Sequence, residues 1–478
     1  MTDDDVLVDR LARTLADAGE ALPPAPAGTL GGIRHRLARR RRRARAAAAA
    51  LIAVVTVLTA VGPRLGLRLP GTPTPAAAPG TIHVWALDTV DSNPGLRECA
   101  DRFERDTGTR IELSTYANEA YKDLLSGPAL TGAAAPGIFE TWGGAGLAGP
   151  VRAGAVADLT DDLSRHPAMA STVLGTVLAG GQVGGRQYGL PMTGVQPVLL
   201  FYHKRLFADA GLTPPRTFAE LLTAVDTFRA RRITPIALAG AAGWPALMYL
   251  AYLTDRLGGP GVFTGIAAGR PGAWRHPALL QAAEMTQLLV RRGAFGADAA
   301  TLSYDGGATT RQLGDGRAAM QLMGSWEYGN QLRTNPAFAA GDLGWVPFPT
   351  VPGGTGDPAD VVGVPANYFS VRAGEPHRAE AVEFLLRTVT SPAYLDGLLQ
   401  AGEVPAVRDL EPYLAGRPDA GFVRDVHRLA TGAPAFTLMW DQALPREVAT
   451  ALLVNTRKLF RLGLTPAQFA AAMAAAAG

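Results

Sequence analysis

Cysteine is almost absent from this chain of 478 residues, in which Cys99 stands alone. One cysteine cannot close an intramolecular disulfide, so cysteine usage says nothing about the cellular compartment. Cys99 shares a helical face with Leu96 and Phe103, and we expect it to be a small core residue. The seven histidines lack the spacing of metal ligands, and no G-x-S-x-G, H-E-x-x-H or Walker sequence occurs. We therefore predict no cofactor, no metal site and no enzymatic activity.

Lysine is also scarce, with three residues in the whole chain, so the basic charge comes mainly from arginine. Twelve arginines and six acidic residues lie in residues 1–78, which gives this segment a net charge of +6. The remaining residues contain 33 basic and 36 acidic side chains, a net charge of −3. A mildly acidic body lacks the electrostatic footprint of nucleic-acid binding, so we expect no nucleic-acid partner.

Residues 46–62 form a run of seventeen residues without charge, directly after eight arginines between Arg34 and Arg45. This length lies just inside the range of about 17–25 residues for a transmembrane helix. The arginines place residues 1–45 in the cytoplasm, and five prolines in residues 63–80 indicate a semi-rigid stalk. We therefore predict a single-pass cell-membrane protein with an extracellular body. The alternative is a signal peptide cleaved near Ala76–Ala78, against which the long N-terminal segment argues.

Strand and helix patterns alternate after residue 80, as is typical of an α/β fold with a largely parallel sheet. A first set comprises strands at 81–86, 110–115 and 137–140 and helices at 94–105 and 118–126. A second set comprises helices at 217–230, 244–257 and 276–292 and strands at 233–238 and 343–349. Residues 378–389 again have a helix pattern, and the chain is helical from about residue 406 onward.

The stretch from Tyr188 to Pro215 connects these two sets. Residues 195–202 are a nearly unbroken apolar run, which indicates a buried strand. Residues 203–210 have helical spacing, and Gly211 ends that helix. Thr217 is placed to cap the next helix, with Glu220 completing a capping box. A strand that follows the first set of elements and leads directly into a helix of the second set indicates a crossing between two lobes.

The motifs YGLP, FYHK, LF, AGL, PP and TFAEL occur in this order between Tyr188 and Leu221. In this order and spacing they resemble the sugar-binding proteins of ABC importers, the maltose-binding-protein-like group of solute-binding protein family 1. The resemblance extends over residues 80–478 and implies an α/β, two-lobe fold of the periplasmic-binding-protein type. Residues 361–371 resemble the return crossing of that fold, and the crossing segments would act as a hinge.

The resemblance also divides the body. It implies that residues 81–194 are the first part of the first lobe and that residues 195–361 are the first part of the second lobe. Residues 362–405 would then return to the first lobe. Residues 406–478 would be C-terminal helices, mainly of the second lobe.

Residues 144–149 match the dinucleotide fingerprint G-x-G-x-x-G and follow a predicted strand. Pro150 directly follows the last glycine, where the fingerprint requires a long binding helix. In the family that the chain resembles, a loop and short helix with sugar contacts occupy this place. We therefore do not expect a dinucleotide site.

Four tryptophans stand at the ends of predicted elements. A sugar presents an apolar C–H face on which an aromatic ring can stack, and hydroxyls that polar side chains bind. The segments IFETW, GWP, GSW and AFTLMW resemble the family's aromatic positions, and this resemblance implies ligand contacts by Trp142, Trp244, Trp326 and Trp440. The alternative for each tryptophan is packing in the core or on a lobe surface.

Polar candidates occupy the expected strand ends and crossings. Residues 316–320, GRAAM, resemble a strand segment of the family. Tyr304 and Asp305 precede a helical run ahead of this segment, and either could reach the cleft between the lobes. Asp88 and Asp91 follow the first strand, where clefts form at the carboxyl edge of a sheet, although a solvated loop is equally compatible. Gln196 and Asn367 lie within the two apolar crossings, where a ligand hydroxyl could satisfy a buried polar group.

These observations predict a monomeric, non-catalytic protein that captures a carbohydrate ligand, an oligosaccharide, between two lobes. By the resemblance, it would deliver the sugar to the permease subunits of an ABC importer. One alternative is a membrane-tethered sensor that uses the same cleft and signals through residues 1–45. Another is a glycosidase, because paired carboxylates cannot be recognised from the sequence of so long a chain.

Overall fold

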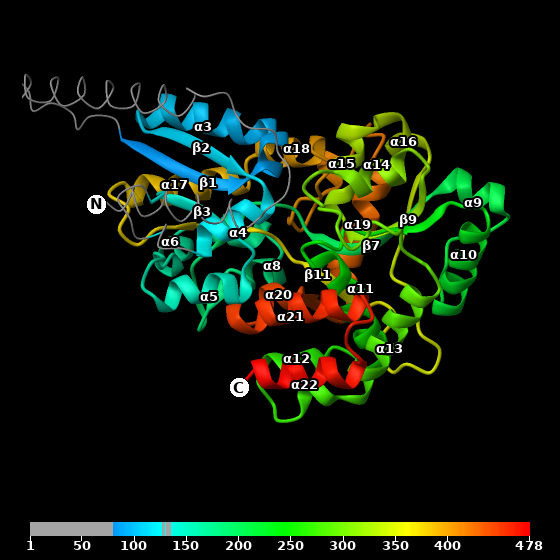
Figure 1. The fold of residues 1–478 in the computed structure, drawn as a ribbon. Helices are drawn as coiled ribbons and strands as arrows, with labels where there is room; N and C mark the ends of the chain where they lie inside the picture. Colours follow the sequence, from blue (N-terminus) through cyan, green and yellow to red (C-terminus); the bar gives the residue numbers. More distant parts are fainter. Residues whose placement is uncertain (1–79, 127–129, 131–134) are drawn as a thin grey trace, which may run out of the picture. The chain divides into compact units, whose positions relative to one another are not determined.

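The computed structural model describes residues 80–126, 130 and 135–478 (Figure 1). The predicted cytoplasmic segment and transmembrane helix, and the stalk up to residue 79, lie outside the described residues. Among the helices of the described part, none combines the length and apolar character needed to cross a bilayer. Residues 79–478 form one compact unit, and its two larger sheets define the two lobes.

The first lobe is built on a five-stranded sheet with the order β2-β1-β3-β12-β6. Its strands are β1 (Thr81–Leu87), β2 (Arg110–Tyr116), β3 (Ile138–Thr141), β6 (Leu190–Pro191) and β12 (Tyr368–Val371). Strand β1 pairs in parallel with β2 and β3, whereas β12 is antiparallel to β3 and β6. The prediction of a largely parallel sheet is therefore wrong for two of the four strand pairings. Both involve β12, which enters this sheet from the second lobe and runs in the opposite direction.

Helix α3 (Pro94–Thr107) shows how local sequence positions the first lobe's helices. The Asn93 side chain accepts hydrogen bonds from the backbone N–H groups of Gly95 and Leu96, at 2.9 and 3.3 Å, and so caps the helix. Cys99 is buried on its apolar face, as expected. The remaining helices of this part are α4 (Asn118–Ser126), α5 (Gly144–Arg152), α6 (Thr160–Ser164), α7 (Pro167–Thr172), α8 (Gly175–Ala179), α17 (Arg378–Val389) and α18 (Pro392–Gln400).

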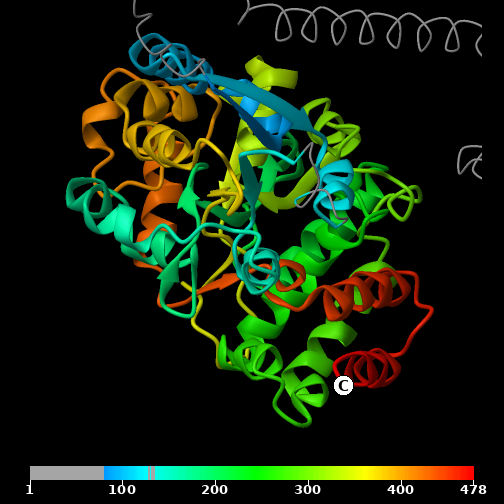
Figure 2. The same ribbon diagram turned by 90° about the vertical axis from the view of Figure 1, so that its left-hand side faces the viewer.

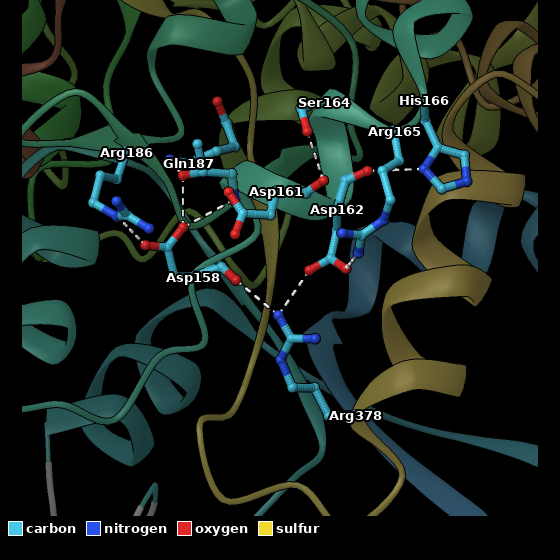
Figure 3. Close-up of polar contacts among 10 residues, drawn as sticks. Asp158, Asp161, Asp162, Ser164, Arg165, His166, Arg186, Gln187 and Arg378 are labelled. Carbon is cyan, nitrogen blue, oxygen red and sulfur yellow. Dashed lines mark hydrogen bonds and ion pairs between the residues drawn. The ribbon is translucent and has the colours of Figure 1, made fainter.

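The returning helix α17 is tied to the earlier part of the first lobe by charge. The Arg378 guanidinium donates to the Asp162 carboxylate and to the backbone oxygen of Asp158, both at 2.7 Å (Figure 3). Asp162 also pairs with Arg165, and the Asp158 carboxylate pairs with Arg186. Helix α6 and the hairpin of β4 (Gln182–Val183) and β5 (Arg186–Gln187) are thereby linked to the start of α17.

The second lobe is built on a sheet with the order β13-β11-β7-β9-β8, to which β10 adds by pairing with β7. The strands are β7 (Gln196–His203), β8 (Thr234–Ala237), β9 (Ala318–Gly324), β10 (Leu343–Val346), β11 (Val361–Val364) and β13 (Phe436–Leu438). The predicted strand at 195–202 is confirmed as β7, whose residues are buried except for the half-buried Tyr202. Strand β13 was not expected, because its three residues lie in a region with helical patterns.

Helices enclose this second sheet. Helix α11 (Trp244–Gly258) is buried over almost its whole length and packs against α13 (Pro277–Arg291) and α21 (Arg446–Phe460). Helix α22 (Pro466–Ala476) lies beside α21 at the C-terminus (Figure 2). The other helices are α9 (Lys204–Ala210), α10 (Phe218–Ala230), α12 (Gly261–Ala267), α14 (Ala308–Gly314), α15 (Trp326–Thr334), α16 (Pro336–Gly341), α19 (Ala420–Gly432) and α20 (Trp440–Ala443).

The cap of α10 follows the prediction only in part. The Thr217 hydroxyl accepts a hydrogen bond from the Glu220 backbone N–H at 3.2 Å, as expected. The Glu220 carboxylate instead accepts from the backbone N–H of Arg216 at 2.7 Å, one residue before the position that a capping box requires. A complete capping box is formed at the start of α22 by Thr465 and Gln468.

The chain passes between the two lobes three times. The first passage connects β6 to β7, the second connects β11 to β12, and the third leads from α18 to α19. The passages touch one another, because the Val195 N–H donates to the Val404 oxygen at 2.8 Å and the Asn367 N–H donates to Thr193 Oγ1 at 2.7 Å. A Cβ atom on Gly194 would lie 2.1 Å from the Val404 oxygen, so only glycine permits this approach. The sequence described two crossing segments, and its division of the body implied a further passage near residue 405; the predicted domain boundaries stay predictions.

Candidate functional site

A cavity of about 350 Å³ is lined by residues of both lobes and of the passages between them. The first lobe contributes the end of β1, the start of α4 and the residue after β3. The second lobe contributes the starts of α11 and α15, the loop before α14 and the segment after β13. The first lobe's contribution agrees with the rule that clefts of open α/β sheets form beyond the carboxyl ends of the strands.

Eight of the ten side chains that the sequence singled out line this cavity. They are Asp88 and Trp142 from the first lobe, Gln196 and Asn367 from the passages, and Trp244, Tyr304, Asp305 and Trp326 from the second lobe. The structure therefore brings together residues that are almost 280 positions apart in the chain. Their contact with a ligand stays a prediction.

Trp440 and Asp91 are the two exceptions, and Trp440 is the larger miss. Its side chain is 1% exposed and is not part of the cavity lining. The ring stacks on Phe263 at a centroid distance of 4.8 Å and also contacts Trp274, so it belongs to the core of the second lobe. Asp91, the neighbouring candidate to Asp88, is exposed, and its carboxylate binds Arg97 and Thr115 rather than lining the cavity.

Three aromatic rings form the second lobe's wall of the cavity. The Trp244 ring lies 5.1 Å from Tyr304 in an edge-to-face arrangement and 6.3 Å from Trp326, measured between centroids. Trp326 Nε1 donates to the Tyr304 hydroxyl at 2.9 Å, whereas Trp244 Nε1 is buried without a hydrogen-bond partner. The N–H group of Trp326 is therefore hydrogen-bonded within the protein, whereas the N–H group of Trp244 still requires an acceptor.

A buried glutamate holds this wall in place. Tyr304 donates its hydroxyl hydrogen to Glu327 Oε2 at 2.8 Å, and Asn330 Nδ2 donates to the Tyr304 oxygen at 2.7 Å. Glu327 is completely buried, and its burial raises the pKa of the carboxyl above its ordinary value. The hydrogen bonds fix the tyrosine and Trp326 before any ligand arrives, which reduces the entropy lost on binding.

Lys122 connects the aromatic groups of the two lobes. Its Nζ atom lies 5.7 Å from the ring centroids of both Trp142 and Trp244. The same ammonium group lies 3.3 Å from Glu119 Oε1. A cation near the faces of two rings is attracted by their negative π-systems, so Lys122 positions charge between the two walls.

Asp305 makes a direct contact across the cavity. Its Oδ2 atom accepts a hydrogen bond from the Glu119 backbone N–H, at the start of α4, at 3.2 Å. The carboxylate of the second lobe thus binds a free N–H group in the first turn of a first-lobe helix, where negative charge is favoured. This contact favours the arrangement in which the lobes approach one another.

Three carboxyl groups that line the cavity have raised pKa values. Burial raises the pKa of Asp441, of Glu403 and of Asp88 above the ordinary values, and Asp305 raises the pKa of Asp88 further. Asp441 Oδ1 is buried without a hydrogen-bond partner. These groups favour a ligand that donates hydrogen bonds, as hydroxyl groups do.

Several lining residues were missed from the sequence: Lys122, Arg333, Glu403, Asp441 and Gln442. Asp441 and Gln442 directly follow the predicted Trp440, so the segment was recognised but the wrong side chain was chosen. Glu403 lies on the third passage, between α18 and α19, where no candidate was chosen. The scarcity of lysine was the one available signal for Lys122. Within the described residues, no group of three or more His, Cys, Asp or Glu side chains is arranged to hold a metal ion.

Comparison with known proteins decides the family. A family model described as bacterial extracellular solute-binding protein matches residues 88–394. The chain belongs to this family. The matched residues contain all of the cavity-lining side chains predicted from the sequence, and the expected family resemblance is therefore confirmed.

Three similar proteins are informative. The diacetylchitobiose binding protein DasA of Streptomyces coelicolor is 25% identical over 358 residues, which are 71% of this chain and 76% of that protein. A structure from a study of xylan utilisation by Caldanaerobius polysaccharolyticus has a TM-score of 0.74 at 26% identity and covers 82% of this chain and 98% of its own. A chitin oligosaccharide binding protein has the same fold, with a TM-score of 0.73 at 24% identity, over 84% of this chain and 98% of its own.

Proposed function

We propose that this chain is a sugar-binding protein that captures an oligosaccharide in the cavity between its lobes, without catalysis. The observation that carries the proposal is the pairing of aromatic and hydrogen-bonding groups on both sides of one cavity. Trp142 lies on the first-lobe side, and Trp244 and Trp326 lie on the second-lobe side. Rings on both sides would stack on sugar faces, while Gln196, Asn367 and the carboxylates would bind hydroxyls.

The comparisons support this choice of ligand class. Names of relatives refer to diacetylchitobiose and to chitin oligosaccharides, and one similar structure comes from work on xylan. The cavity volume of about 350 Å³ lies within the range of roughly 300–1,000 Å³ for small-molecule sites. As an extracellular solute-binding protein, the chain would pass its sugar to the permease subunits of an ABC importer and act as a monomer.

The experiment is calorimetric titration of the full-length protein with a panel of chitin, xylan and maltose-type oligosaccharides. We expect saturable one-to-one binding of at least one member, and no change in the oligosaccharides on prolonged incubation. Shortened oligosaccharides after incubation would contradict the non-catalytic assignment and support the glycosidase. Absence of binding by every member would contradict the assignment to sugars.

We further propose that residues 46–62 anchor the protein, with residues 1–45 in the cytoplasm. The support is the uncharged run of seventeen residues behind eight arginines. Intact-mass measurement on the membrane fraction should then find the uncut chain of 478 residues. A soluble protein whose first residue lies near Ala78 would contradict the anchor and indicate a cleaved signal peptide.

A further inference from the structure

Glu140 lies at the end of β3, directly behind the cavity, and is 1% exposed. Its Oε2 atom accepts a hydrogen bond from the backbone N–H of Leu87 at 2.8 Å. Its Oε1 atom accepts from Asn367 Nδ2 at 2.7 Å. Leu87 and Asn367 both line the cavity, whereas Glu140 does not. The glutamate therefore acts on the cavity only through these two neighbours.

Asn367 is held in place except for the orientation of its side-chain amide. Its backbone N–H donates to Thr193 Oγ1 at 2.7 Å, and its backbone oxygen accepts from the Met192 N–H at 2.9 Å. The side chain is 4% exposed, and its Oδ1 atom has no hydrogen-bond partner in the protein. An unpartnered acceptor in a buried side chain that lines a cavity indicates a partner supplied by a ligand.

The charge of Glu140 determines which end of this amide it can bind. An ionised carboxylate only accepts hydrogen bonds, so it binds Nδ2 and leaves Oδ1 without a partner in the protein. A protonated carboxyl donates one hydrogen, and Asn367 Oδ1 is the acceptor within reach once the amide has turned by half a rotation. The Leu87 N–H can remain bonded to Oε2 in both states.

Glu140 is placed to change its charge near neutral pH. Burial raises its pKa from the ordinary 4.5 to about 7, although the bonds from Leu87 and Asn367 lower it. Glu403 on the third passage and Asp88 beyond β1 raise it further. The other titratable groups facing it are Tyr121 of α4, which is hydrogen-bonded to the Glu140 backbone, and Tyr394 of α18.

We propose that Glu140 is a positioning residue that sets which atom of the Asn367 amide meets the ligand. The ionised glutamate presents Oδ1, an acceptor, and the protonated glutamate presents Nδ2, a donor. The cavity would therefore exchange one acceptor for one donor as the medium becomes acidic, without a change of fold. The proton comes from solvent, and no other bond is made or broken. This proposal rests on the proposed function insofar as the ligand is a sugar.

The test uses the full-length protein with ¹⁵N-labelled asparagine, so that the Asn367 side-chain NH₂ signals can be followed from pH 5.5 to 8.5. In the wild type these signals should shift, with a midpoint near the pKa of about 7 of Glu140. In Glu140→Gln the glutamine amide can bind Leu87 through its oxygen and donate to Asn367 Oδ1. That variant should hold the acidic position of the signals at every pH.

Glu98→Gln is the matched control, because Glu98 is an exposed glutamate of α3 paired with Arg102. It should titrate like the wild type. A wild-type signal that does not move, or a Glu140→Gln signal that still titrates, would overturn the proposal. If the variant fails to fold, the wild-type titration alone decides.

Binding provides a second, independent measurement. For each oligosaccharide of the panel that binds, affinity in the wild type should change by on the order of tenfold across the same pH range, since one buried hydrogen bond is mismatched at one end. Glu140→Gln should keep the acidic value throughout. If no oligosaccharide binds, the proposed function fails, while the ligand-free NMR titration still decides the role of Glu140.

Discussion

At the scale of single residues, Gly324 explains why the segment GSW places an aromatic ring in the cavity. A Cβ atom at this position would lie 1.9 Å from the Trp326 ring. Only glycine at the end of β9 therefore allows the ring to fold back over the strand. The Tyr304 hydroxyl then fixes the indole nitrogen at 2.9 Å. Gly324 and Trp326, two residues apart in the chain, therefore determine the position of the ring together.

We predict that Gly324→Ala weakens sugar binding by roughly tenfold, because the added methyl group must displace the Trp326 ring from the cavity wall. Gly146→Ala is the matched control, since nothing lies within 4 Å of a Cβ atom there. Calorimetric titration measures both affinities. An unchanged affinity for Gly324→Ala would show that this ring does not contact the ligand.

Glu140 allows a prediction for stability. Because burial raises its pKa from 4.5 to about 7, the folded protein holds this proton more tightly than the unfolded chain does. The stabilisation is complete below pH 4.5 and is lost as the pH rises through about 7. Relative to Glu140→Gln, the wild type should lose up to on the order of 3 kcal/mol of unfolding free energy between about pH 5 and 8.5.

Denaturant unfolding of both proteins at several pH values measures this difference, with Glu98→Gln as the control that should follow the wild type. A pH-independent difference between wild type and Glu140→Gln would mean that Glu140 keeps one charge state throughout this range.

The sequence predicted the position of a side chain correctly where a local pattern determines it. It failed where packing against distant residues determines the direction of the side chain. Trp142 and Trp326 follow strand ends, and both line the cavity. Trp440 stands equally well at an element's start, yet its ring enters the core while Asp441 faces the cavity. The direction of a side chain at a helix start depends on packing against Phe263, which lies far away in the sequence.

At the scale of elements, apolar periodicity and caps predicted β7, α3 and the start of α10 to within one or two residues. Strand direction could not be predicted, because it depends on which distant strand is the neighbour. Strand β7 pairs antiparallel with β9, β10 and β11, and these partners are more than one hundred residues away. Strand β13 was missed for the same reason.

The contact between Asp305 and helix α4 provides a prediction at this scale. Asp305→Ala removes the carboxylate that binds the Glu119 N–H across the cavity at 3.2 Å. Since this contact is exposed, we expect a loss of less than about 1 kcal/mol, which is less than about fivefold in sugar affinity. Asp315→Ala is the control, because Asp315 pairs with Arg317 on the surface. Unaltered affinity for Asp305→Ala would mean that the contact does not support binding.

At the scale of the whole body, three passages connect two sheets, and the cavity lies where the sheets' ends face one another. This arrangement suits hinge closure, in which the lobes move as units and the passages absorb the backbone change. A saturating oligosaccharide should therefore not increase the radius of gyration in solution scattering, and it should decrease it if the free protein is open. An increase on binding would contradict closure.

In the proposed function, a sugar is held between aromatic rings of both lobes. The most direct measurement is calorimetric titration of Trp142→Ala and Trp326→Ala with an oligosaccharide that binds the wild type, alongside circular dichroism melts. Each variant should lose on the order of 2 kcal/mol, or about thirtyfold in affinity, and remain folded. Trp345→Ala should bind normally, because Trp345 does not line the cavity. Normal affinity in both cavity variants would contradict the account and place the ligand elsewhere.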